Sequence, residues 1–178
     1  MAVIGNYSPD DYTVVISVPG KNFTHRITGF SEGSFISMER LVPTSSAYQG
    51  VGAKSQGRVK RKITSLSVTI TLSQLSSSND VLQALQAADA QDSTSNEWVF
   101  SCTMADLSGT HKVSTNTAII QAPATKAFGD TIDSRDWVIH MFDSNEEGGG
   151  NMLLSEAEVA SITAAGGTVD DRWKLSNQ

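Results

Sequence analysis

Hydrophobic and polar residues alternate along several short stretches of the chain, most regularly at 64–72. The residues that would share one face there are Thr64, Leu66, Val68, Ile70 and Leu72. The residues between them are all serine or threonine. A period of two is typical of a strand with one buried face. The uncharged, hydroxyl-rich face suits close contact with another sheet, or the lining of a lumen.

Similar β-branched or alternating runs predict six further strands. They cover about 11–18, 23–30, 34–42, 97–104, 112–122 and 135–142. Turns are expected around Gly20 and Gly33, because glycine accepts a positive φ without a steric penalty. The first three strands would therefore form a β-meander. In the last strand both faces are apolar enough to be covered.

The segment 79–90 has the pattern of an amphipathic helix. Val81, Leu82, Leu85 and Ala88 fall on one stripe of such a helix. Ser78 is the expected N-cap, because its hydroxyl can accept a hydrogen bond from the first turn. We expect this helix to cover one face or an open end of a sheet.

The composition changes after residue 142. The run 146–151 is rich in glycine and predicts a linker. Ser155 and Glu158 have the spacing of a capping box, which predicts a short helix running to about Ala165. The remaining residues form a polar tail in which Trp173 is the one expected anchor.

These elements predict a mainly β protein. The expected fold class is a small β-barrel or sandwich of two packed antiparallel sheets, with one flanking α-helix and a C-terminal helical appendage. The hydrophobic fraction of 39% and the many small residues fit a fold with numerous turns. We expect a β domain over 1–142 and a C-terminal extension over 143–178.

The stretch 43–62 interrupts the strand pattern with proline, glycine and serine, and we interpret it as a loop without secondary structure of its own. Loops of this length are uncommon in a compact domain unless they are functional or disordered. We expect it to reach a neighbouring subunit; a disordered tip is the alternative. Its basic residues, which are the candidate contact residues between subunits, are Lys54, Arg58, Lys60, Arg61 and Lys62.

Charge is distributed unevenly along the chain. The net charge of −6 argues against a conventional nucleic-acid-binding protein, whose affinity depends on neutralising phosphates. The segment 54–62 holds five bases and no acid, whereas 143–171 holds seven acids and no base. Such segregation allows head-to-tail contact between copies. The alternative is that both segments are solvated loops.

Two motifs resemble a catalytic site and a calcium site, but the residues around them do not fit those sites. Residues 29–33 match G-x-S-x-G, but both flanks are predicted strands, and a nucleophile elbow requires a strand followed by a helix. Residues 143–148 begin like a calcium-binding EF-hand loop, but position 12 would be Leu154, where a bidentate glutamate is required. We expect a turn at the first motif and no calcium-sensor site at the second.

The remaining candidate ligands and nucleophiles are isolated. His25, His111 and His140 lack the spacing of metal ligands. Cys102 is the one cysteine and lies in a strand-like alternation, where a buried, inert thiol is expected. We therefore expect no enzyme activity, no metal and no cofactor.

Neither a secretion signal nor a membrane segment is expected. The first residues lack the charged and long apolar regions of a signal peptide. No apolar run approaches the roughly 20 residues that span a bilayer. The expected location is therefore the cytosol in which the chain is made.

The order of several short motifs resembles that of tail tube proteins from contractile-tailed bacteriophages. The matching stretches are Tyr7–Asp11 before the first strand, Ile27–Phe30, Gly33–Arg40 and Ser76–Leu82. The resemblance covers roughly residues 5–142, and the segment 143–178 departs from the family's pattern.

The resemblance implies a virion structural protein of a myovirus. Six copies would form a ring whose inner sheets line a channel, and the rings would stack into a tube for DNA ejection. It implies contacts with the tail sheath, baseplate and tail terminator proteins, while genomic DNA passes through the lumen without specific binding. The loop 43–62 would contact adjacent subunits or rings. The protein would be in the host cytoplasm during assembly and then in the virion.

Two other functions are compatible with the sequence. The first is that of a tube protein in a type VI secretion apparatus or another phage-like contractile device. A β-sandwich carbohydrate-binding module has a similar length and strand number, but such modules present exposed aromatic residues on one face, and the three tryptophans and three tyrosines here are scattered. The extension 143–178 is expected to lie outside the tube, where it would touch the sheath or a neighbouring subunit.

Overall fold

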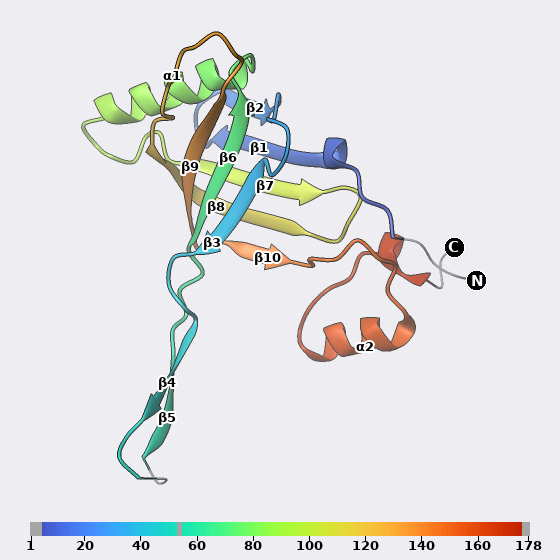
Figure 1. Ribbon diagram of the computed structural model, residues 1–178. Helices are drawn as coiled ribbons and strands as arrows, with labels where there is room; N and C mark the ends of the chain where they lie inside the picture. Colours follow the sequence, from blue (N-terminus) through green and yellow to red (C-terminus); the bar gives the residue numbers. More distant parts are fainter. Residues whose placement is uncertain (1–4, 53–54, 176–178) are drawn as a thin grey trace. The chain divides into compact units, whose positions relative to one another are not determined.

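The computed structural model describes residues 5–52 and 55–175. These residues form ten β-strands and two α-helices (Figure 1). They group into two compact units. The first unit is drawn from Met1–Ile27, Ser101–Ser114 and Asn145–Gln178, and the second from Thr28–Phe100 and Thr115–Ser144.

The sheet of the first unit is built on three antiparallel strands in the order β2-β1-β7. Their bounds are Tyr12–Val18 for β1, Phe23–Ile27 for β2 and Phe100–Asp106 for β7. Gly20 turns the chain between β1 and β2 with a φ of 76°. Val14, Ile16 and Val18 alternate into the core, as the sequence predicts.

The C-terminal segment adds a short strand to the first unit. This strand is β10, Asn145–Glu147, and it pairs with the first residues of β8, Lys112–Ala122. The sequence predicts a linker that includes Glu146 and Glu147. The structure differs because their backbone groups can pair with those of Lys112 and Val113.

The predicted capping box is confirmed. Ser155 caps α2, Glu156–Ala164, by accepting from the amide of Glu158, whose carboxylate accepts from the amide of Ser155. A 3-10 turn, Asp171–Trp173, follows. The amide of Leu154 donates to the carbonyl of Trp173 at 2.7 Å.

The second unit contains antiparallel strands in the order β8-β9-β6-β3. Their bounds are Ile36–Arg40 for β3, Leu66–Ser73 for β6 and Ser134–Phe142 for β9. The predicted inward face of β6 is confirmed from Leu66 to Leu72, and Trp137 on β9 is also fully buried. The neighbouring strands pair Ile70 with Trp137.

The helix α1, Ser78–Gln91, packs on this unit through Leu82 and Leu85. The indole of Trp137 donates to the side-chain oxygen of Asn79 at 2.9 Å. The prediction that Ser78 is the N-cap is wrong, since Ser77 occupies that position. The hydroxyl of Ser78 is instead buried and accepts from the amide of Thr28 at 3.0 Å.

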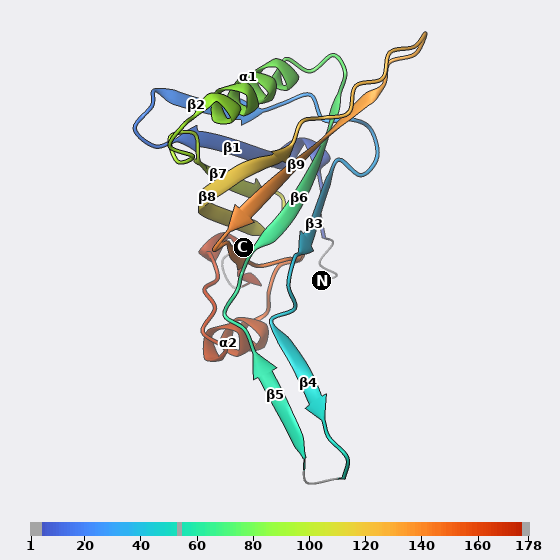
Figure 2. The same cartoon turned by 90° about the vertical axis from the view of Figure 1, so that its left-hand side faces the viewer.

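The stretch predicted as a loop without secondary structure is a β-hairpin. Its strands are β4, Ser45–Gln49, and β5, Gln56–Lys60, which pair only with each other. The two strands extend the chain beyond β3 and β6 (Figure 2). The prediction is wrong because neither strand carries a hydrophobic alternation, and their pairing satisfies the backbone without a buried face.

The fold class is confirmed as mainly β, with packed antiparallel sheets and a flanking helix. The sandwich form of that prediction holds, and the barrel form does not. The strand order ends at β2 in the first unit and at β3 in the second. Because both are edge strands, the strands do not close into a barrel.

Candidate functional site

The β4–β5 hairpin is the main candidate surface of the second unit. Its register runs from Ser45 opposite Lys60 to Gln49 opposite Gln56. Backbone hydrogen bonds between the two sides of the hairpin continue past both ends of the paired strands. At the tip the amide of Gly50 donates to the carbonyl of Ser55, and at the base the amide of Arg61 donates to the carbonyl of Thr44, each at 2.8 Å. The hairpin is thus an ordered ribbon rather than an irregular loop.

The two faces of this ribbon differ in chemistry. Residues directly opposite each other share a face, and successive residues alternate between faces. Tyr48 and Val59 therefore lie on one face, where their exposed fractions are 62% and 50%. Arg61 continues that face at the base of the ribbon. Arg58 and Lys60 lie on the opposite face.

Four of the five predicted contact residues are present on or beside this ribbon, and all four are exposed: Arg58, Lys60, Arg61 and Lys62. The fifth, Lys54, lies outside the described residues. Among the ion pairs between described residues, none involves these four bases. Bases gathered without acids repel one another, and an acidic surface brought by another molecule would relieve this repulsion.

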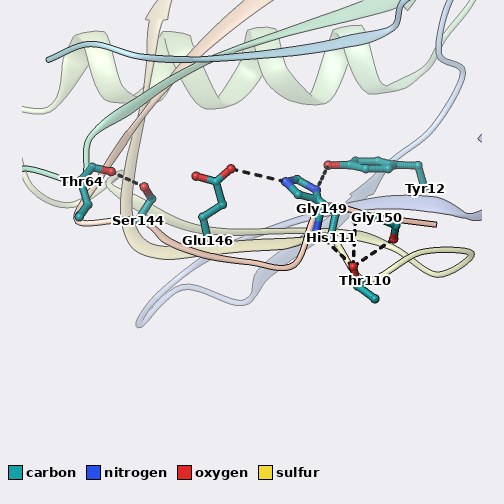
Figure 3. A network of polar contacts seen from close by, with 8 residues as sticks. All are labelled: Tyr12, Thr64, Thr110, His111, Ser144, Glu146, Gly149 and Gly150. Carbon is teal, nitrogen blue, oxygen red and sulfur yellow. Dashed lines mark hydrogen bonds and ion pairs between the residues drawn. The ribbon is translucent and has the colours of Figure 1, made fainter. Parts of the chain in front are cut away.

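The base of the hairpin is tied to the end of β9. The buried hydroxyl of Ser144 donates to the carbonyl of Thr64, which lies two residues before β6 (Figure 3). The polar face of β6 is half-buried, and the hydroxyl of Thr71 donates to Asp136 at 2.7 Å. The hairpin therefore projects from a well-connected end of the sheet.

A second cluster of polar groups lies in the first unit. The hydroxyl of Tyr12 lies 3.5 Å from Nδ1 of His111, and Nε2 of the same ring lies 3.9 Å from the carboxylate of Glu146 (Figure 3). The rings of Tyr12 and His111 are stacked at 6.4 Å. Burial, together with the charge of Asp106, raises the pKa of Tyr12. The cluster connects β1 with β10.

The glycine-rich segment after β10 is held by Thr110. Its hydroxyl accepts from the amides of Gly149 and Gly150 at 3.1 Å each, and donates to the carbonyl of Gly150 at 3.0 Å (Figure 3). Gly148 has a φ of 71°, and a Cβ there would collide with the carbonyl of Thr110. Glycine is therefore required for close packing at this position.

Asp106 anchors the same segment. Its carboxylate accepts from the amide and hydroxyl of Ser108 at 2.9 and 2.7 Å, and from the side-chain amide of Asn151 at 2.8 Å. Burial opposes ionisation of this carboxyl, but these donors outweigh it and hold the pKa of Asp106 below its usual value. Ser108 and Asn151 belong to the same unit as Asp106. We therefore interpret Asp106 as a structural anchor within that unit.

The other residues singled out from the sequence have structural surroundings. Cys102 is buried, and burial raises the pKa of its thiol to about 12, so it stays protonated at neutral pH. His140 stacks on Phe142 at 4.3 Å. His25 lies in β2. The turn that includes Gly29 and Gly33 is followed by β3 and not by a helix.

No group of three or more metal-ligating side chains is gathered within residues 5–52 and 55–175. Over the same residues, no helix has the length and hydropathy needed to cross a lipid bilayer.

Sequence reasoning missed the apolar face of the hairpin and the Asp106 anchor. A local signal exists for the first, because Tyr48 and Val59 each stand between polar or small residues in an extended run. The second depends on the approach of Asn151 to Asp106 across 45 residues of chain, which no local pattern indicates.

Comparison with known proteins places the chain in a family. No protein-family model matches it. It is 35% identical, over 167 residues, to the protein named structural protein ORF10 of Pseudomonas phage KPP10, covering 94% of this chain and 95% of that protein. The chain belongs to the family of this phage protein. Because the alignment covers almost the whole chain, it includes residues of both units.

A solved structure, the tube-terminating cap of the anti-feeding prophage, aligns with a TM-score of 0.49 and 9% sequence identity. The alignment covers 84% of this chain and 95% of that one.

Proposed function

We propose that this chain is a structural subunit of the inner tube of a phage tail. Six copies would form a ring, and rings would stack into the channel through which DNA leaves the virion. The observation that carries the proposal is the exposed β4–β5 hairpin, in a chain whose relative is named a structural protein of a phage. The motif order shared with tail tube proteins supports the same assignment.

The energetics of the hairpin favour an assembled state. An isolated two-stranded hairpin is at best marginally stable in water. The ribbon has no buried residue, and Tyr48 and Val59 remain largely exposed. Docking on another subunit would bury this apolar surface and supply acids for the bases. The hairpin is therefore better explained as an assembly arm than as a solvated loop.

The charge of the chain fits a channel for DNA. A basic lining would retard a polyanion, whereas a net charge of −6 and a hydroxyl-rich face on β6 would let it pass. Arg58, Lys60 and their neighbours would then lie at joints between subunits, away from the lumen. Sheath, baseplate and terminator proteins would meet the outside and the ends of the tube, in the host cytoplasm during assembly.

The test replaces Lys60, Arg61 and Lys62 together by glutamate. We expect the variant to fold normally by circular dichroism, because all three side chains are exposed. We expect tubes to be absent or much shorter in negative-stain electron microscopy, because like charges would face each other at the joint. The control replaces Lys21 and Arg26, exposed bases of the first unit, by glutamate. Tubes of normal length from the triple variant would refute the assignment of the hairpin.

A further inference from the structure

A second exposed apolar surface lies on the second unit, at the other end of β6 from the hairpin. It consists of Leu75, Phe128 and Ile132, whose exposed fractions are 75%, 78% and 68%. Leu75 follows β6, and the other two lie in the loop that joins β8 to β9. Figure 2 shows this loop and the hairpin at opposite ends of β6.

The two segments that form this surface are tied together. The amide of Gln74 donates to the carbonyl of Asp133 at 2.9 Å, and the amide of Asp133 donates to the side-chain oxygen of Gln74 at 3.2 Å. Phe128 lies over the guanidinium of Arg135, 5.1 Å from ring centre to Cζ. The segments that carry Leu75 and Ile132 are therefore held together, and Phe128 lies against Arg135.

Charge at this end has the opposite sign to charge at the hairpin. Asp130 and Asp133 lie within the loop, and Asp136 follows it on β9; all three are exposed. Lys126 is the one exposed base of the same loop. The exposed charges of the second unit are thus basic before the start of β6 and mainly acidic around its other end.

Arg135 supplies an independent observation. It is only 7% exposed, and its Nη1 is the one buried side-chain nitrogen or oxygen without a hydrogen-bond partner in the described part of the chain. Buried donors are rarely left unpaired, because an unmade hydrogen bond is costly. The unpaired atom belongs to the guanidinium that Phe128 covers. An acceptor oxygen from another molecule that docks beside Phe128 would satisfy it.

The hairpin and this surface cannot meet within one chain. They are separated by β6, whose eight residues span about 26 Å at roughly 3.3 Å per residue. A contact between them must therefore join different copies. It is heterologous, because two different patches meet, and it propagates from copy to copy.

We propose that the apolar face of the hairpin in one copy docks on the Leu75–Phe128–Ile132 surface of the next copy. Tyr48 and Val59 pack on the three apolar side chains, and Arg61, which shares their face, pairs with Asp130 or Asp133. The proposal rests on the proposed function, since it supplies the joint between successive rings. It identifies the receiving surface, which the basic cluster alone does not.

Cysteine cross-linking tests the contact directly. One sample carries Val59→Cys, a second carries Ile132→Cys, and the two are mixed under mild oxidation. We expect a disulfide-linked dimer in the mixture, at roughly tenfold or more the yield in either sample alone. The native Cys102 does not interfere, because it is fully buried. The matched control replaces Ile132→Cys by Leu107→Cys, an exposed aliphatic position on the first unit.

Exchanging the charges of Arg61 and of Asp130 and Asp133 provides a second test of the contact. Arg61→Glu should shorten or abolish tubes, and so should Asp130→Arg with Asp133→Arg. Combining all three changes in one chain should restore them. A control with Asp10→Arg and Glu156→Arg alters two exposed acids elsewhere and should leave tubes intact.

The outcomes separate the two proposals. If the unmodified chain forms tubes but the mixture gives no specific cross-link, the docking surface is wrong and the tube assignment stands. If the cross-link forms but no rings or tubes are seen, the head-to-tail contact stands and the tube assignment fails. A cross-link of equal yield in the control mixture, or no rescue by charge exchange, overturns the docking surface.

Discussion

At the scale of single residues, Asp106 shows how the chain fixes a segment that has no hydrophobic pattern. Its carboxylate holds both Ser108 and Asn151, and it is 8% exposed. The sequence predicts the Ser155–Glu158 capping box correctly because that motif is local. It fails at Ser78, because the hydroxyl of that residue is taken by Thr28, fifty residues away.

Asp106→Asn should destabilise the protein by roughly 1–3 kcal/mol, the usual cost of leaving buried partners unsatisfied. The new amide would keep one acceptor oxygen, and its NH2 group would face the donors of either Asn151 or Ser108. Urea unfolding followed by circular dichroism measures the loss. Asp10→Asn, at an exposed position, is the control and should change the free energy of unfolding little. Equal stability of the two variants would contradict the role of Asp106 as an anchor.

The destabilisation caused by Asp106→Asn should depend on pH. The pKa of Asp106 is lower in the folded state than the value of about 3.9 expected for an unfolded chain. Its ionised form therefore stabilises the fold above about pH 4, and this contribution disappears as the pH falls through the folded-state pKa. The stability gap between the unmodified chain and Asp106→Asn should narrow in that acidic range. A gap that widens on acidification would contradict this account.

At the scale of elements, strands with a buried face could be predicted and elements without one could not. The strand 112–122 is predicted with the bounds that β8 has, and the inward residues of β6 are predicted from alternation alone. The β4–β5 hairpin escapes prediction because it buries no side chain. Strand β10 escapes because pairing with β8, and not its own sequence, makes it a strand.

Truncation tests how the C-terminal segment contributes. Deleting 153–178 removes α2 but keeps β10 and Asn151. We expect this variant to fold with near-native stability, because few buried contacts are lost. Deleting 146–178 also removes Glu146 and the Asn151 side chain, and should lower the melting temperature clearly. Thermal unfolding of both variants provides the comparison. Equal melting temperatures would show that 146–152 is not an integral part of its unit.

At the scale of the whole molecule, the mainly β class follows from the sequence, but the two units do not. The first unit combines three segments that are separated in the chain by residues 28–100 and 115–144, and the sequence carries no local signal for such pairing. The same limit applies to function. The basic cluster is visible in the sequence, and Tyr48 and Val59 each leave a local signal there. The strand register that places both on one face with Arg61, and the surface at the other end of β6, emerge only from the folded arrangement.

We propose above that the chain assembles with copies of itself through the hairpin into stacked rings. Negative-stain electron microscopy of the purified chain tests it most directly, with mass photometry on the same sample. We expect six-membered rings with a central hole, and tubes of stacked rings at higher concentration. A uniform population of monomers at every concentration, with no ring in any field, would contradict it.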